Sequence, residues 1–480
     1  MKKNSYLLFA FPAAVPLLLI LFSFLKSHWG WCLVNDYQYL TLGTNFWDKL
    51  CKIYVYFLGM GQLKWTHHFR YAFVYTVFAH NPKWFFLYQW GEIVAMCGVW
   101  GMVAYRLTGE KITFLLFPTV VLTSRCFYDA FFFPTLGDNF AMLIFGLGLL
   151  ALVRAESLAI GQPNSTLRNR LWLYVLVFFF LALGAMEFTL AGIMAVGCAL
   201  GWLYQVRRDF RLLMTGIFLV MVGLLYGVFL KTCIAHGYSS AYSLTDAHKI
   251  IFNVMMWAKE VFKIESIWLV AGGGIIFKSW GRGFWLKYSI SERFGIFLAV
   301  LMYVLWLAVL LPWHANGYHA VPLVIVFGFL VTVLLARPLK GLDERWFAAI
   351  VAGALFFNLF FAQQEIYIAR TYNSDIQRLL YFVEGNSSFQ QAALAEKVFC
   401  NQIEPAESLP HWANKQAGLS LKRFIYEPDV LSADSKGAGY FVFITLGQPL
   451  GTYLNAPGWE PVFVGEFCKV YKKRGFLRAG

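Results

Sequence analysis

The sequence predicts an α-helical polytopic membrane protein that carries a small α+β domain at its C-terminal end. Of the 480 residues, 59% are hydrophobic and 19% are aromatic, and the mean hydropathy is +0.58. Soluble domains rarely reach such values. The hydrophobic residues also gather into runs near the ~20-residue length that crosses a bilayer as a helix. After residue 362, by contrast, polar turns and short strand-like runs take over.

Eleven hydrophobic runs are predicted to be membrane helices. They span residues 6–25, 85–105, 112–127, 138–153, 171–184, 187–204, 212–230, 264–278, 294–311, 319–336 and 346–362. The basic residues fall into every second gap between these runs, and Lys and Arg near helix ends resist translocation. These gaps are therefore predicted to be cytoplasmic. The odd number of runs then places the N-terminus inside and the C-terminus outside.

The net charge of +14 does not indicate a nucleic-acid partner, because the cations lie in the short cytoplasmic gaps that set orientation. The run 6–25 is interpreted as a first helix rather than a cleavable signal, since no clear small-residue cleavage site precedes Lys26. The size of the chain and the absence of a long cytoplasmic domain, together with the family resemblance of the motifs given below, lead us to expect a multi-pass protein of the bacterial inner membrane.

Two domains are predicted, a membrane module over 1–362 and an extracytoplasmic domain over 363–480. The outer loop 26–84 has apolar residues at helical spacing, which predicts short amphipathic helices along the membrane surface. In the tail, a helix is predicted over 388–400. Strands are predicted at Tyr440–Thr445, Pro461–Val464 and Phe467–Tyr471.

The cysteine spacing leaves two pairings open. Cys32 and Cys51 share the first outer loop, and Cys400 and Cys468 share the tail. Each pair is either bridged, if the outer space is oxidising, or a pair of free thiols.

Polar and ionisable residues gather in the segments predicted to face outward. They are Asp36, His67, His68, Arg70, Arg125, Asp138, Glu187, His314 and His319. Ionisable groups near membrane depth are costly and tend to be functional. A helix cap is an equal alternative for Asp138, which opens a predicted helix. His67 and His68 are adjacent, so on a helix they point about 100° apart and do not both face one ligand.

Several short segments together resemble the GT-C superfamily of glycosyltransferases, which use polyprenyl-phosphate sugars. The resemblance lies in Val34–Tyr37, Trp65–Arg70, Phe133–Asn139, Leu149–Arg154, Trp313–Pro322 and Gly465–Tyr471. The first of these is similar to the family's acidic motif. The second is similar to a His-Pro-Pro-like segment but lacks its prolines.

The resemblance implies an inverting transfer of a sugar from a polyprenyl-phosphate donor to an acceptor hydroxyl on the outer face. Asp36 matches the family's catalytic acid and is expected to be the general base. The expected substrate-binding residues are His67, His68, Arg70, Arg125, Asp138, Glu187, His314 and His319. No cofactor is required by the residues themselves. A divalent cation (Mg or Mn) would bind only if the fold gathers Asp36, Asp138 and Glu187.

Other functions remain open at this point. A transporter or flippase of lipid-linked glycans should show internal repeats and charges near the bilayer midplane, and neither is found. An O-antigen polymerase or ligase would join whole glycans. A phosphoethanolamine transferase would need a nucleophile with a zinc cluster, and none is apparent. The expected partners are the donor, membrane lipids and a glycan, lipid or protein acceptor.

Overall fold

The computed structural model describes most of the chain. The described residues are 5–27, 29, 42–59, 63–78, 81–132, 137–161, 166–186, 188–233, 247–279, 284–310, 320–402, 406, 409–411, 413–414, 418–427, 429–445 and 458–476. The chain forms two compact units. The first consists of Met1–Phe22, Leu50–Phe73 and Phe86–Gln363, and the second of Ser23–Lys49, Val74–Phe85 and Gln364–Gly480.

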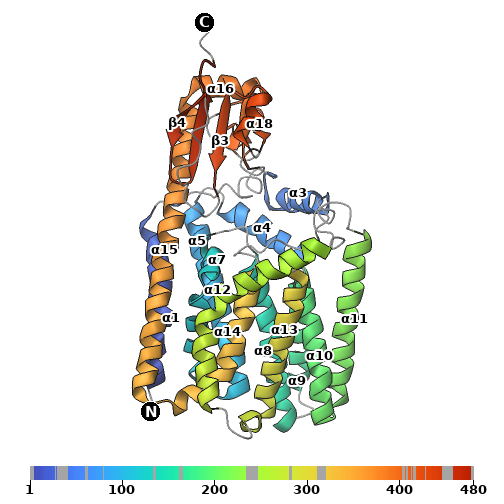
Figure 1. Cartoon of the computed structure of the whole chain (residues 1–480). Coiled ribbons are helices and arrows are strands. Elements are labelled where there is room, and N and C mark those ends of the chain that lie inside the picture. The colour runs from blue at the N-terminus through green and yellow to red at the C-terminus, as the bar shows by residue number, and fades with distance from the viewer. Residues whose placement is uncertain are drawn as a thin grey trace. The chain divides into compact units, whose positions relative to one another are not determined.

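The first unit is a bundle of long helices (Figure 1). Its helices are α1 (Ala10–Lys26), α5 (Pro82–Thr108), α6 (Thr113–Leu122), α8 (Asp138–Gly161), α9 (Thr166–Leu183), α10 (Thr189–Arg207), α11 (Phe210–Cys233), α12 (Ala247–Ser279), α13 (Ile290–Leu310), α14 (Val321–Leu335) and the first part of α15 (Glu344–Gly385). Shorter pieces are η1 (Ser5–Phe9), η2 (Arg125–Tyr128), α7 (Asp129–Phe132), η4 (Phe284–Lys287) and η6 (Pro338–Gly341). Each of the eleven predicted runs coincides with helix in this bundle.

The predicted class, a polytopic helical membrane protein, is confirmed. Among the described helices, seven are long and apolar enough to span a membrane, or eight if the bent α6–α7 segment counts as one span. The length and composition of the described helices therefore support fewer membrane spans than the eleven predicted. The long helices α5 and α12 are not among the seven, and each contains charged residues, such as Glu92 and Glu265.

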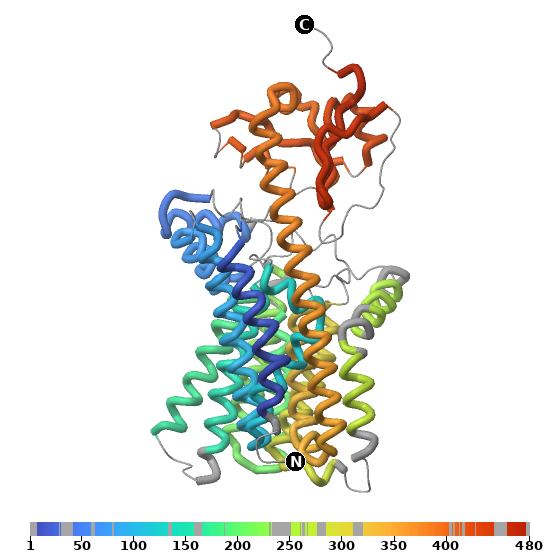
Figure 2. Tube along the Cα trace, turned by 90° about the vertical axis from the view of Figure 1, so that its left-hand side faces the viewer, coloured from blue at the N-terminus to red at the C-terminus, as the bar shows by residue number. Residues whose placement is uncertain are grey.

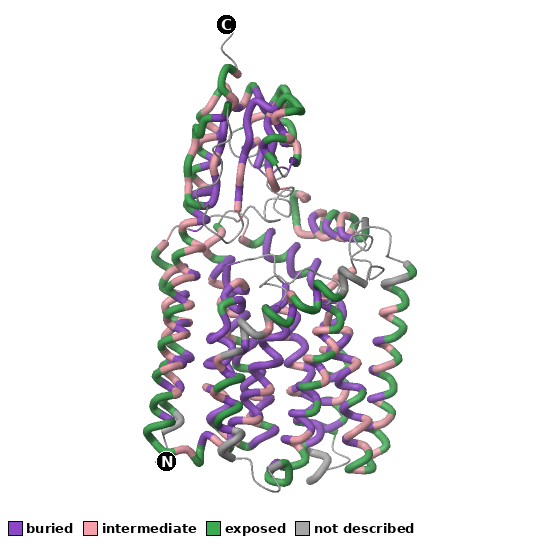
Figure 3. The backbone as a smooth tube through the Cα atoms, viewed as in Figure 1, coloured by how far each residue is buried: buried purple, intermediate pink, exposed green. Residues whose placement is uncertain are grey.

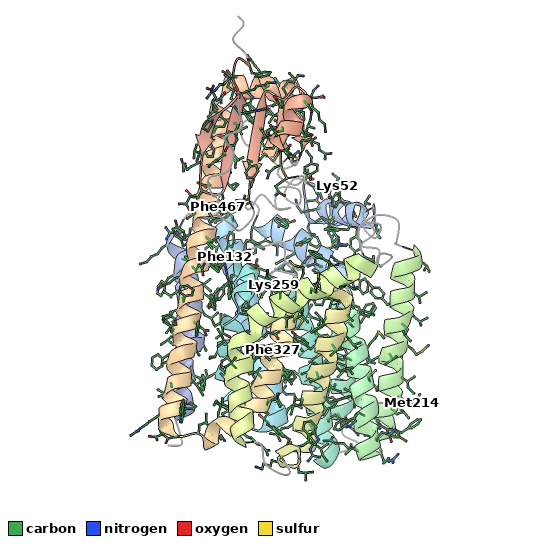
Figure 4. All side chains as sticks on the ribbon, in the orientation of Figure 1. Lys52, Phe132, Met214, Lys259, Phe327 and Phe467 are labelled. Atoms are coloured by element: carbon green, nitrogen blue, oxygen red, sulfur yellow. The ribbon has the colours of Figure 1, made fainter. Side chains whose placement is uncertain are left out.

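The helices of the bundle differ in how far they are exposed, as expected if some of them face lipid and others lie in the interior. α11 exposes large apolar side chains such as Phe218 and Leu225, whereas α14 is buried along almost its whole length (Figure 3). Met214 projects from the outer side of α11, and Phe327 lies among the helices (Figure 4). Apolar side chains exposed on a bundle of this kind fit a hydrocarbon environment better than water.

Three differences from the predicted boundaries are the largest. The predicted helix 112–127 is broken, because the chain bends by 95° between α6 and the η2–α7 segment. The predicted helix 264–278 is only the second half of α12, which starts at Ala247 in a region expected to be loop. α15 runs on to Gly385 rather than ending at 362. In the loop 26–84, the expected short helices are found as α3 (Phe46–Gly59) and α4 (Trp65–Val77).

Asn358 of α15 joins three helices of the bundle. Pro16 in α1 has no backbone N–H, which leaves the carbonyl of Pro12 without its helical partner. The Asn358 amide donates to that carbonyl at 2.7 Å and to the carbonyl of Thr119 in α6 at 3.2 Å. Tyr128 in turn donates to the Asn358 carbonyl at 2.9 Å. Because unpaired carbonyls are costly in an apolar interior, this asparagine fixes α1 and α6 on α15.

The second unit contains a five-stranded sheet of order β2-β1-β3-β5-β4. Figure 2 traces this part of the chain in orange to red. Its strands are β1 (Val398–Cys400), β2 (Ile425–Tyr426), β3 (Tyr440–Ile444), β4 (Trp459–Val464) and β5 (Cys468–Lys473). β1 is parallel to β2 and β3, and β5 is antiparallel to β3 and β4. The short helices are α16 (Ser387–Leu394) and α18 (Val430–Ser435). The small α+β domain and its three predicted strands are confirmed, but the predicted helix 388–400 ends at Leu394 and β1 occupies its last residues.

Within this unit, α15 is attached to the sheet through Asp375. The buried Asp375 carboxylate accepts the backbone N–H of Phe467 at 2.8 Å. Gly465 lies against the same carboxylate, so close that a Cβ there would be 2.5 Å from Oδ2. A larger residue at 465 would therefore break this attachment.

The structure settles one cysteine pair. Cys400 and Cys468 are free thiols on β1 and β5, which β3 separates. Since neighbouring strands lie ~4.8 Å apart, the two strands are ~10 Å apart, beyond the ~7 Å that a disulfide spans between Cα atoms. Cys51 is also free, and Cys32 lies outside the described residues.

Candidate functional site

Helix α4 is fixed at its start by the turn that follows α9. The first N–H groups of a helix have no partner within it. Here the N–H groups of Thr66 and His67 both donate to the carbonyl of Gly184, at 2.9 and 3.1 Å. The ring of Trp65 covers Gly184, where a Cβ would lie 2.1 Å from the indole. Only glycine fits, and its contact joins the start of α4 to the α9–α10 turn.

His67 is placed against the start of α8. Its ring packs on Gly137, at which a Cβ would be 2.0 Å from the ring carbon Cε1. Gly137 directly precedes Asp138, the first residue of α8, and both His67 and Asp138 are buried. Two predicted site residues that are 71 positions apart in the numbering of the chain therefore lie at the same helix mouth.

His68 faces a different direction, as helical geometry predicts for adjacent residues. It stacks on Phe57 of α3 with ring centroids 4.6 Å apart and an interplanar angle of 16°, and it meets Tyr54 edge-on at 4.8 Å. Among the described atoms, neither of its ring nitrogens has a hydrogen-bond partner.

Both histidines are neutral at physiological pH. Burial lowers the pKa of His68 to about 3, and the charge of Lys64 adds to this effect. Burial also lowers the pKa of His67 well below its usual value, with contributions from Arg70, Lys64 and His68. α4 is not one of the candidate membrane spans. The two imidazoles therefore offer hydrogen bonds rather than positive charge.

Arg70 is held in a buried ion pair. Its Nε and Nη2 donate to the two carboxylate oxygens of Glu92 in α5, at 2.9 and 2.5 Å. Asn139 of α8 donates to the same carboxylate at 3.2 Å. The side chains of Arg70 and Glu92 are 2% and 6% exposed. This network joins α4, α5 and α8, and leaves Nη1 as the arginine nitrogen without a partner among the described residues.

Lys64 is a cation that sequence reasoning missed. It lies half-buried just before α4 and is near enough to Asp138, His67 and His68 for its charge to act on all three. Glu92 and Asn139 were missed too. The only signal for Lys64 was its place beside the Trp65–Arg70 segment, and a lone lysine in a loop is usually solvated.

Arg125 begins η2, directly after the break that ends α6. Within 112–132, a stretch that is described throughout, it is the one exposed residue. Asp36, Glu187, His314 and His319 lie outside the described residues, so their roles stay predictions. Met186, next to Glu187, follows the Gly184 turn on which α4 is fixed.

The divalent cation stays a prediction, because Asp36 and Glu187, two of its three expected carboxylates, lie outside the described residues. No group of three or more His, Cys, Asp or Glu side chains is gathered among them, and the charge that acts on Asp138 is that of Lys64. No step proposed below uses a metal ion.

Comparisons with known proteins give little further information. No family model matches the sequence, and no curated protein is significantly similar to it. A crystal structure of ArnT from Cupriavidus metallidurans bound to undecaprenyl phosphate is similar over 98% of this chain and 98% of its own, with 14% sequence identity and a TM-score of 0.44. A likeness of that size does not assign a fold or a function. The chain is a multi-pass helical membrane protein with a buried polar cluster at the mouth of α8.

Proposed function

We propose that the protein is an inverting glycosyltransferase of the GT-C type. It transfers a sugar from a polyprenyl-phosphate donor to an acceptor hydroxyl on the outer face of a bacterial inner membrane. Asp36 is the general base. The N-terminus is then cytoplasmic, and the C-terminal domain, beginning near residue 363, is extracytoplasmic.

One observation carries the proposal: polar residues from separate outer segments converge on one helix mouth. Lys64 and His67 come from the loop 26–84, and Asp138 from the start of α8. The turn after α9 joins them through Gly184. A membrane bundle that gathers cationic, acidic and neutral hydrogen-bonding groups at its edge suits a substrate with a charged head and an apolar tail.

The chemistry requires a base, a cation and exclusion of water. Asp36 takes the proton of the acceptor hydroxyl as its oxygen attacks the anomeric carbon. The bond from that carbon to the phosphate oxygen breaks, and polyprenyl phosphate leaves with an added negative charge. Lys64 and Arg125 stabilise this charge. His67, His68 and Asp138 orient the head group by hydrogen bonds. Attack opposite to the leaving phosphate inverts the anomeric carbon.

The test is the Asp36→Asn variant, which keeps the size of the side chain and removes the base. Purified protein in liposomes is given a panel of radiolabelled polyprenyl-phosphate sugars with a mixed glycan and lipid acceptor pool. We expect transfer to fall by about 10²-fold or more, the usual contribution of a general base.

The matched control is Asp48→Asn in the same outer loop. Asp48, the third residue of α3, accepts the backbone N–H of Thr44 at 2.9 Å, and the amide oxygen of asparagine can accept the same hydrogen bond. This variant should transfer sugar at the wild-type rate. Wild-type activity in Asp36→Asn would show that Asp36 is not the base.

A further inference from the structure

The break between α6 and η2 is held by hydrogen bonds to three other helices. The hydroxyl of Thr123, at the end of α6, accepts the indole N–H of Trp268 in α12 at 2.6 Å and donates to the carbonyl of Val120 at 2.5 Å. On the far side of the break, Gln89 of α5 donates to the carbonyl of Ala130. Tyr128 donates to the Asn358 carbonyl in α15.

Such support is expected where a membrane helix is interrupted. Backbone that leaves helical geometry inside an apolar bundle must find its hydrogen bonds in the surrounding protein. Thr123, Ser124 and Cys126 are all buried, with exposures of 3%, 3% and 7%. Arg125, in the middle of this run, is the exposed one. The bend therefore directs a single cation out of an otherwise closed segment.

We infer that Trp268 is a positioning residue for Arg125: its hydrogen bond to Thr123 fixes the bend, and the bend fixes where the guanidinium meets the phosphate of the lipid-linked donor. The inference rests on the proposed function for the identity of that phosphate. Trp268 itself need not touch the donor. Its indole is 4% exposed and packs in the apolar core around Leu116 and Phe327.

The experiment measures the affinity of the purified full-length protein for polyprenyl phosphate, together with KM and kcat for the donor. Trp268→Phe removes the N–H and keeps an aromatic ring. Thr123→Val removes the acceptor from the other side, and Thr123→Ser keeps it. The control is Trp100→Phe, because Trp100 is also buried and donates to the carbonyl of Met142 at 2.9 Å.

Trp268→Phe and Thr123→Val should each weaken polyprenyl phosphate binding by about 2- to 10-fold, the range of one hydrogen bond. KM should rise and kcat should fall, because Arg125 also stabilises the charge that develops on the leaving phosphate. Thr123→Ser and Trp100→Phe should match the wild type. On an Arg125→Ala background, Trp268→Phe should cause no further loss.

The proposed function and the positioning role of Trp268 can be overturned separately. If the wild type does not bind polyprenyl phosphate, the proposed function fails. If it binds and Arg125→Ala weakens binding, but Trp268→Phe behaves like Trp100→Phe or adds fully to Arg125→Ala, only the positioning role is overturned. Unchanged binding in Arg125→Ala also overturns it, because no cation is then being positioned.

Discussion

Breaking the Arg70–Glu92 pair should destabilise the protein much more than removing both charges. Both side chains are almost fully buried, at 2% and 6% exposure, and they share two hydrogen bonds of 2.9 and 2.5 Å. Glu92→Gln leaves the guanidinium buried without a counter-charge, which costs about 3–5 kcal/mol. Arg70→Met leaves the Glu92 carboxylate buried without a counter-charge, at a similar cost. In the double variant Arg70→Met/Glu92→Leu no buried charge remains, and apolar replacement of such pairs is often neutral.

Unfolding free energies are measured by titrating sodium dodecyl sulfate into mixed micelles while following tryptophan fluorescence. The double variant loses one further contact, the 3.2 Å hydrogen bond from Asn139 to Glu92, so we expect it within ~1 kcal/mol of the wild type. The double-mutant cycle should then give a coupling energy of at least ~3 kcal/mol. Single variants that each cost under ~1 kcal/mol and add in the double variant would refute the reasoning.

The same double variant separates structure from binding for Arg70. If the guanidinium only ties α4 to α5 and α8, the double variant keeps the wild-type affinity for polyprenyl phosphate. If its remaining Nη1 binds the phosphate, affinity falls by about tenfold or more, the effect of losing a charged hydrogen bond.

Three further substitutions or conditions test other parts of the account. Asn358→Leu removes two donated hydrogen bonds within the bundle and should cost about 1–3 kcal/mol in the same titration; a loss under ~0.5 kcal/mol would mean that the carbonyls find other partners. Because burial lowers the pKa of His68 to about 3, its contribution to stability is complete above pH 6.5 and declines as the pH falls. By pH 5 the loss is ~2 kcal/mol, so His68→Phe should flatten the pH dependence of unfolding, and an unchanged slope would contradict the assignment. Gly137→Ala should push His67 out of place and lower sugar transfer about tenfold or more, whereas Gly91→Ala, with open space around it, should not; equal activities would exclude a role for this contact.

The fold class was predictable because its signal is spread over many residues. Hydrophobic runs of spanning length occur throughout the sequence, and each coincides with helix. Boundaries were less predictable where polar and apolar signals conflict. Lys259 and Glu265 lower the local hydropathy of α12, so its first half was not predicted to be helix. The end of α15 was placed too early because its later turns are polar although they remain helical.

The site was predictable only in part, because its partners are distant in sequence. The pattern indicated His67, His68, Arg70 and Asp138, and the structure brings His67 to Asp138 across Gly137. It did not indicate Glu92, which lies in an apolar helix and pairs with an arginine 22 positions away. Such a carboxylate has no local signature, since only the packing of α4 on α5 shows what neutralises it.

The most direct test of the central claim is a cryo-electron microscopy map of the full chain in lipid nanodiscs with bound polyprenyl phosphate. We expect phosphate density beside Lys64, His67 and Asp138 at the mouth of α8, with Asp36 facing the same space and the isoprenoid tail between helices. Phosphate density at another end of the bundle, or Asp36 remote from this cluster, would contradict it.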